Sequence, residues 1–100
     1  MITHIVFFNV AESAEGMNKN QILSKMKSDL ESLKGKVPQI RELSVGINAK
    51  PDSNAWDLAL YTKFDSFDAL DAYQKNPDHV AVAQFIGKVR TGRAVVDYEG

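Results

Sequence analysis

The sequence predicts an α+β fold in which a four-stranded antiparallel sheet carries its helices on one face. Residues 2–9 are apolar at almost every position, which is typical of a central strand that is covered on both faces. Residues 18–34 place apolar side chains at the spacing of a helix. Three later segments alternate apolar and polar residues, as strands with one buried face do.

The first strand, residues 2–9, presents two different apolar faces. Successive side chains of a strand point to opposite faces, so the even-numbered positions share one of them. That face carries Ile2, His4, Val6 and Phe8. We expect the helices to cover the opposite face, at Ile5 and Phe7, and to leave the even-numbered face without cover from its own chain.

The first helix is predicted over residues 18–34, after a loop at residues 11–17. Asn18 is a suitable N-cap, and Gln21 stands three residues later, where a capping box needs it. Gly35 fits a left-handed residue at the end of the helix. The apolar stripe of this helix consists of Ile22, Leu23, Met26, Leu30 and Leu33.

The second half of the chain adds three strands and a second helical region. The expected strands are residues 43–48, about 55–64 and about 93–99. The first of these begins after Ile40 or includes it through a bulge. Ser66 and Asn76 are suitable caps for a helix over residues 67–75 and for a short helix that begins at Pro77. The order of strand, helix, strand, strand, helix, strand is the ferredoxin-like βαββαβ arrangement.

The strand expected at residues 55–64 also separates its side chains between two faces. The face suited to the core carries Trp56, Leu58, Leu60, Thr62 and Phe64. The other face is mixed, and we expect its Ala59 and Tyr61 to lie beside the even-numbered face of the first strand. A sheet face this apolar is an association surface. The sequence therefore predicts a homodimer whose two open sheet faces meet around an enclosed space.

Composition excludes several classes of function. The 12 basic and 13 acidic residues give a net charge of −1, and they form no basic patch that would attract nucleic acid or a membrane surface. The absence of cysteine excludes disulfides, thiolate nucleophiles and iron–sulfur ligation. No signal peptide or membrane span is recognisable, so we expect one cytoplasmic domain over residues 1–100. No spaced ligand motif indicates a metal, and nothing indicates an organic cofactor.

Five motifs in order resemble the stress-responsive dimeric α/β-barrel (Dabb) family. They are the opening strand 3–8, residues 37–40 leading to Val45-Gly46, residues 56–60, the run 73–79, and the closing 95–99. The resemblance covers the whole chain and implies a ferredoxin-like protomer paired into a dimeric barrel. It implies no single activity, although one family member, the plant olivetolic acid cyclase, closes a polyketide by aldol condensation without a cofactor.

The resemblance to that cyclase implies candidate catalytic residues at His4, His79 and Tyr73. His79 falls at the third position of a helix capped by Asn76, where the helix dipole keeps an imidazole neutral and usable as a general base. His4 would then orient or polarise a carbonyl, and Tyr73 would donate to a developing oxyanion. Many relatives carry a histidine where this chain has Asn76, which weakens the catalytic inference relative to the fold.

Three functions follow from these residues, and the shape of the site distinguishes them. The first is a homodimeric barrel that binds a small apolar or aromatic ligand, with contacts from Val6, Phe8, Tyr61 and Asp57. The second is a cofactor-free cyclase, lyase or monooxygenase-like enzyme that uses His79 with His4 and Tyr73. The third is a structural dimer with a filled interior. A pocket that both imidazoles enter favours the second function, and an apolar pocket with tied histidines favours the first.

Overall fold

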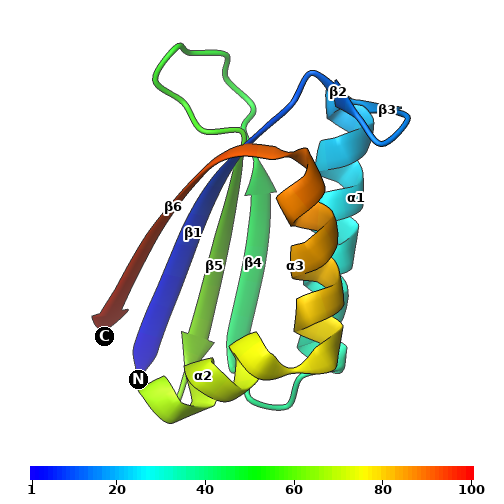
Figure 1. Cartoon of the computed structure of the whole chain (residues 1–100). Coiled ribbons are helices and arrows are strands. Elements are labelled where there is room, and N and C mark those ends of the chain that lie inside the picture. Colours follow the sequence, from blue (N-terminus) through cyan, green and yellow to red (C-terminus); the bar gives the residue numbers. More distant parts are fainter.

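A computed structural model describes all 100 residues, and it contains one four-stranded antiparallel sheet with helices on one side (Figure 1). The sheet strands are β1 (Ile2–Val10), β4 (Glu42–Ile47), β5 (Leu58–Phe64) and β6 (Arg90–Glu99). The helices are α1 (Lys19–Ser32), α2 (Phe67–Lys75) and α3 (Pro77–Val89). The strands are ordered β4-β5-β1-β6, so the first strand is central, as predicted. No helix has the length and apolar character that crossing a membrane requires.

Local signals in the sequence place the helix boundaries accurately. Asn18 accepts a hydrogen bond from the Gln21 amide while the Gln21 side chain accepts one from the Asn18 amide, which completes the predicted capping box. Ser66 caps α2, and Asn76 caps α3 with Pro77 in its first turn. Short-range side-chain geometry therefore determines where each helix begins.

The end of α1 and the segment before it differ from the prediction. The helix tightens into a 3₁₀ turn, Leu33–Gly35, and the Leu33 carbonyl accepts hydrogen bonds from Lys36 and Val37. Gly35 is therefore not left-handed. The expected loop at residues 11–17 contains a short hairpin of β2 (Ser13–Ala14) and β3 (Met17–Asn18). Glu15 and Gly16 form its turn with φ values of 51° and 75°, the positive values that a two-residue hairpin requires.

The two faces of β1 are assigned the other way round from the prediction. Val6 pairs with Leu60 and Phe8 with Leu58, and opposed residues of an antiparallel pair share a face. Because the β5 leucines face the helices, the even-numbered face of β1 is the core face. Val6 is 1% exposed. Ile5 and Phe7 are instead only partly buried and lie on the side without helices.

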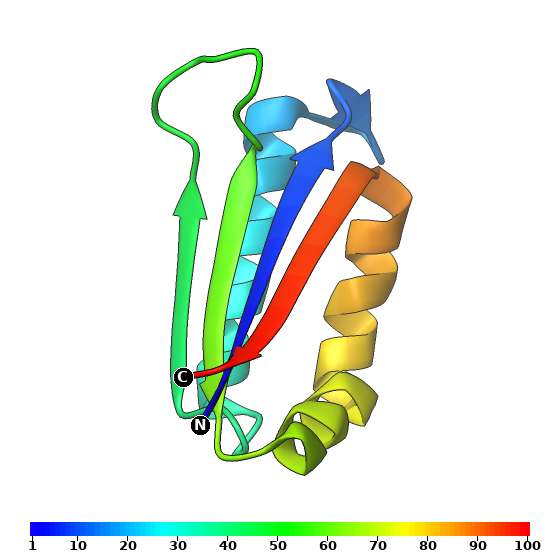
Figure 2. The same ribbon diagram turned by 90° about the vertical axis from the view of Figure 1, so that its left-hand side faces the viewer.

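The side of the sheet without helices, called here the open face, is broad and largely apolar. Figure 2 looks directly onto it, with the four strands in front and the helices behind or beside them. It is formed by Ile5, Phe7, Ala59, Tyr61, Ala94, Val96 and Tyr98. One sheet face is therefore left uncovered by helices, as predicted. The residues that β1 contributes to it are the odd-numbered ones, and the prediction of the even-numbered ones was wrong.

Trp56 also departs from its predicted place in the core. The ladder of β5 starts only at Leu58, so Trp56 does not follow the alternation of that strand. Its ring is 36% exposed and lies 6.4 Å from the ring of Phe7. A Cβ added at Gly92 would lie 3.3 Å from the Trp56 ring, so a glycine permits this close approach. Trp56 thus extends the open face at one end.

Candidate functional site

A cavity of about 140 Å³ lies between the even-numbered face of β1 and the helices. Its apolar walls are Val6, Phe8, Leu30, Leu60, Val82, Ala83, Ile86 and Gly87. The polar residues that line it are His4, Tyr73, Gln74, His79, Arg90 and Arg93. The cavity therefore lies within one protomer, whereas the sequence predicted an enclosed space between two sheets.

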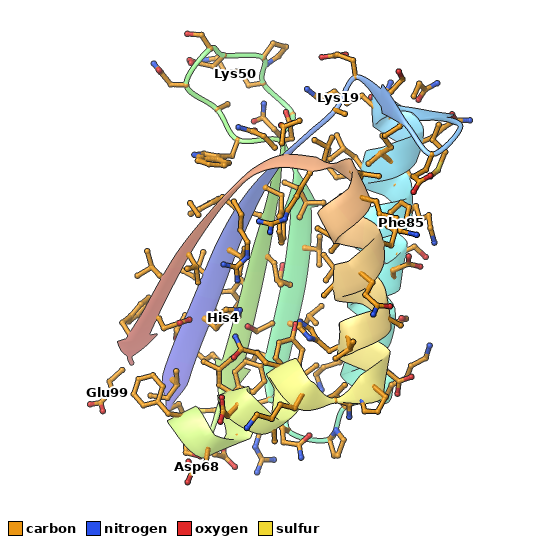
Figure 3. All side chains as sticks on the ribbon, viewed as in Figure 1. His4, Lys19, Lys50, Asp68, Phe85 and Glu99 are labelled. Carbon is orange, nitrogen blue, oxygen red and sulfur yellow. The ribbon has the colours of Figure 1, made fainter.

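His4, the third residue of β1, lies on the strand face that meets the helices, and it is labelled in Figure 3. The side chain is 3% exposed. Its Nδ1 forms a short hydrogen bond with the Asp97 carboxylate, which lies directly opposite on β6. This contact is the one side-chain hydrogen bond of His4, and it uses Nδ1, so Nε2 is free to meet a ligand. A carboxylate that binds one ring nitrogen fixes the orientation of the imidazole and leaves the other nitrogen for a ligand.

Tyr73 lies between the two imidazoles. Its ring centroid is 6.4 Å from that of His4 and 4.3 Å from that of His79. The residue is completely buried, and its hydroxyl has no hydrogen-bond partner. Burial raises the pKa of Tyr73 to about 12, so the hydroxyl keeps its proton at neutral pH. An unpartnered buried hydroxyl is unusual and leaves one donor unused beside the cavity.

His79 occupies the third position of α3, as the sequence predicted. Its Nδ1 lies 3.1 Å from the Gln74 carbonyl oxygen, which can only accept, so the proton resides on Nδ1 and Nε2 carries the lone pair. Burial lowers the pKa of His79, and nearby His4 and Arg93 lower it further, against the hydrogen bond to Gln74. The imidazole is therefore neutral at pH 7, and burial is the largest cause of the lowered pKa.

Two arginines of β6 complete the rim of the cavity. Arg93 pairs with Phe8 across the ladder, so its side chain lies on the same face as the cavity. Arg90 follows α3 directly and pairs with Val10. Neither guanidinium takes part in an ion pair or a side-chain hydrogen bond. Both are exposed, so the rim carries uncommitted positive charge.

The structure brings together five of the seven residues that the sequence proposed for a site. His4, His79, Tyr73, Val6 and Phe8 all line the cavity, while their chemical roles stay predictions. Tyr61 and Asp57 do not line it. Tyr61 belongs to the open face and donates to Glu42, because β5 alternates sides at each residue. Asp57 precedes β5, where it accepts from the Val10 amide and pairs with Lys19 at 3.2 Å.

Asp97, Gln74 and the two β6 arginines were not among the predicted site residues. Asp97 and Arg93 become visible only when the register between β1 and β6 is known, since both lie far from His4 in the sequence. The ferredoxin-like order places β1 and β6 side by side, so the fold class alone predicts that residues of β6 lie near His4. No group of three or more His, Asp or Glu side chains lies close enough together to hold a metal ion.

Comparison with known families identifies the family of the chain. The model of the Dabb family, the stress responsive A/B barrel domain, matches residues 2–100. The chain belongs to the Dabb family. A dimeric protein of unknown function and ferredoxin-like fold, from Bacteroides fragilis, is 33% identical with a TM-score of 0.88. The match covers 99% of this chain and 95% of that chain.

Two further structures share the fold of this Dabb chain. A dimeric ferredoxin-like protein of unknown function from Thermobifida fusca is 23% identical over 99% of this chain and 90% of that chain, with a TM-score of 0.83. The hydroxynitrile lyase of Passiflora edulis is 19% identical over 97% and 90% of the two chains, with a TM-score of 0.80. A comparison with curated proteins finds no match. The resemblance predicted from the sequence is therefore confirmed for family and fold.

Proposed function

We propose that this Dabb protein binds a small ligand with an apolar, ring-sized body in the cavity beside His4, Tyr73 and His79. The observation that carries the proposal is the Tyr73 hydroxyl, which is buried at the cavity without a hydrogen-bond partner. The imidazoles of His4 and His79 line the same cavity, and each uses only its Nδ1 in a hydrogen bond within the protein. A buried hydroxyl without a partner costs about 1–3 kcal/mol, and a ligand that accepts its hydrogen bond would remove that cost.

The size of the cavity limits the ligand. Its volume of about 140 Å³ is close to the roughly 150 Å³ of an engineered apolar cavity that binds benzene. Most of its lining residues are apolar, and among the polar ones the rings of His4 and His79 lie 6.4 and 4.3 Å from the Tyr73 ring. Apolar walls with a few placed polar groups are the usual composition of a small-molecule site.

Filling the cavity from α3 should weaken binding without loss of stability. A Cβ at Gly87 meets no atom within 4 Å, so a larger side chain can enter the cavity from this position. In an NMR titration with benzyl alcohol, we expect Gly87→Leu to weaken binding at least tenfold. The matched control is Gly87→Ala, which gains helix propensity of roughly 1 kcal/mol and leaves most of the cavity free. Equal affinities of the two variants would contradict the proposed site.

We also propose that two protomers pair through their open faces. Related structures from B. fragilis and T. fusca are dimeric, and no helix of this chain covers Phe7 and its neighbours. The open face also carries large exposed apolar side chains, with Val96 at 55% and Tyr98 at 45%. Apolar surface of this kind is typical of an obligate interface.

A charge placed on the open face should separate the protomers. We expect Val96→Glu to weaken dimerisation at least tenfold, because an unpaired carboxylate would be buried against the apolar surface of the second copy. Val80 provides the matched control, since it is 38% exposed on α3, away from the open face. Light scattering across a dilution series should show monomers for Val96→Glu and dimers for Val80→Glu. Dimers of both variants would place the interface elsewhere.

The pair of His4 and Asp97 favours a second function, which is acid–base catalysis without a cofactor. In this proposal His79 Nε2 removes a proton from a carbon next to a carbonyl, and the electron pair moves to the carbonyl oxygen. Tyr73 donates a hydrogen bond to that oxygen, and His4, held by Asp97, orients the group. A hydroxynitrile lyase is among the proteins of this fold, which supports the proposal without identifying a substrate.

Proton exchange provides a direct test of this second function. Acetophenone in D₂O should exchange its methyl protons faster with the protein than with the His79→Gln variant, as followed by NMR. Because the pKa of His79 is lowered, the base stays unprotonated as the pH falls through the usual imidazole range near 6.5, and the rate should decline only below it. Equal rates with both proteins would exclude His79 as the base.

A further inference from the structure

We propose that the natural ligand of the cavity is a small carboxylate, whose anionic group is bound at the rim by Arg93 and Arg90. This inference rests on the proposed ligand-binding function and goes beyond it, because it names the charge and chemical class of the ligand.

The lining of the cavity is positively charged and contains no acid. Arg90 and Arg93 are among its lining residues, and no aspartate or glutamate is. The nearest acid on the same face of β6 is Asp97, whose carboxylate is bound to His4. A ligand carboxylate at the rim would therefore meet two cations and no competing anion.

The two arginines form no ion pair, unlike several other cations of the molecule. Arg41, for example, forms a bidentate pair with Asp65 at 2.9 and 2.6 Å, and three lysines pair with acids four residues away on their own helices. Arg90 and Arg93 have no such partner, and they lie three residues apart at the end of β6 that adjoins α3. A planar guanidinium binds a carboxylate through two parallel hydrogen bonds, which gives direction as well as attraction.

The position of Arg93 also connects the rim with the interior. It lies opposite Phe8, and its charge influences both Tyr73 and His79. A ring-sized ligand whose carboxylate binds Arg93 would fill the apolar part of the cavity with its body. The free volume of about 140 Å³ admits a body of this size with the charged group left at the partly open rim.

Benzoate and benzamide test this inference, because they have nearly the same shape and differ in charge. We expect benzoate to bind at least tenfold more tightly than benzamide in an NMR titration at low ionic strength. Arg93→Gln should remove this preference by weakening benzoate and sparing benzamide, and Arg93→Lys should restore part of it. Arg41→Gln is the matched control and should change neither affinity, since Arg41 does not line the cavity.

The outcomes separate this inference from the function on which it rests. Equal binding of benzoate and benzamide would overturn the carboxylate assignment and leave the ligand site in place. A benzoate preference that survives both Arg93→Gln and Arg90→Gln would also overturn it, because the charge would be recognised elsewhere. Binding of neither compound, with no shift of the cavity resonances, would overturn the inference together with the proposed function.

Discussion

Replacing Phe64 with alanine should lower the free energy of unfolding by about 3–5 kcal/mol, the usual cost of removing a buried aromatic side chain. Phe64 is completely buried at the end of β5, where its ring lies 4.9 Å from that of Tyr73 and 6.5 Å from that of His4. The alanine would leave a void behind two of the candidate site residues. Since domains of this size are stable by only about 5–15 kcal/mol, the loss would be a large share of the total.

Phe67 provides the control for this prediction. It begins α2 only three residues later, but its side chain is 53% exposed, so Phe67→Ala should change stability by roughly 0.5 kcal/mol or less. Urea unfolding at one fixed protomer concentration compares the two variants, because the stability of a dimer depends on concentration. Similar losses of stability for both variants would contradict the burial of Phe64 between β5 and the helices.

Replacing Tyr73 with phenylalanine should have two effects of opposite sign. The hydroxyl of Tyr73 is buried without a partner, so its removal should raise the free energy of unfolding by about 1 kcal/mol. If the hydroxyl donates to a bound ligand, its removal should also weaken the binding of benzyl alcohol by roughly threefold to tenfold, the value of one hydrogen bond. A purely structural tyrosine would lose stability and leave binding unchanged.

Tyr98→Phe is the matched control for Tyr73→Phe. Tyr98 lies on the open face and does not line the cavity, so the loss of its hydroxyl should leave ligand affinity unchanged. Thermal unfolding and NMR titration of the same samples give both quantities. A Tyr73→Phe variant that is less stable than the wild type would mean that the hydroxyl has a partner in the folded protein.

Features that depend on neighbouring residues could be predicted from the sequence. The caps at Asn18, Ser66 and Asn76 act within one turn of backbone, so the residue types identify the helix starts. The alternation of Leu58, Leu60 and Phe64 likewise identified the core face of β5. These elements and their order are sufficient to derive the ferredoxin-like fold.

The orientation of β1 could not be derived in the same way, because both of its faces are apolar. Hydrophobicity alone does not distinguish Val6 from Phe7 when one face meets helices and the other is an association surface. The deciding fact is the register that pairs Val6 with Leu60, and register depends on contacts between distant parts of the chain. The same register determines that Asp97 lies opposite His4 and Arg93 opposite Phe8.

His4, Tyr73 and His79 were chosen by resemblance, and they line one cavity, while their roles stay predictions. Because the even-numbered face of β1 was expected to meet a second protomer, the site was placed between subunits. The structure places these residues between the sheet and the helices of one chain, and Tyr61 and Asp57 do not line the cavity there.

The alternating side chains of β1 allow a direct test of the proposed ligand site on the helix side of the sheet. Intermolecular nuclear Overhauser effects should be recorded between benzyl alcohol and the protein. We expect contacts from the ligand ring to Val6, Phe8 and Tyr73, with none to Ile5 or Phe7. Contacts to Ile5, Phe7 and Ala59 would contradict this expectation and place the ligand on the open face, between the protomers.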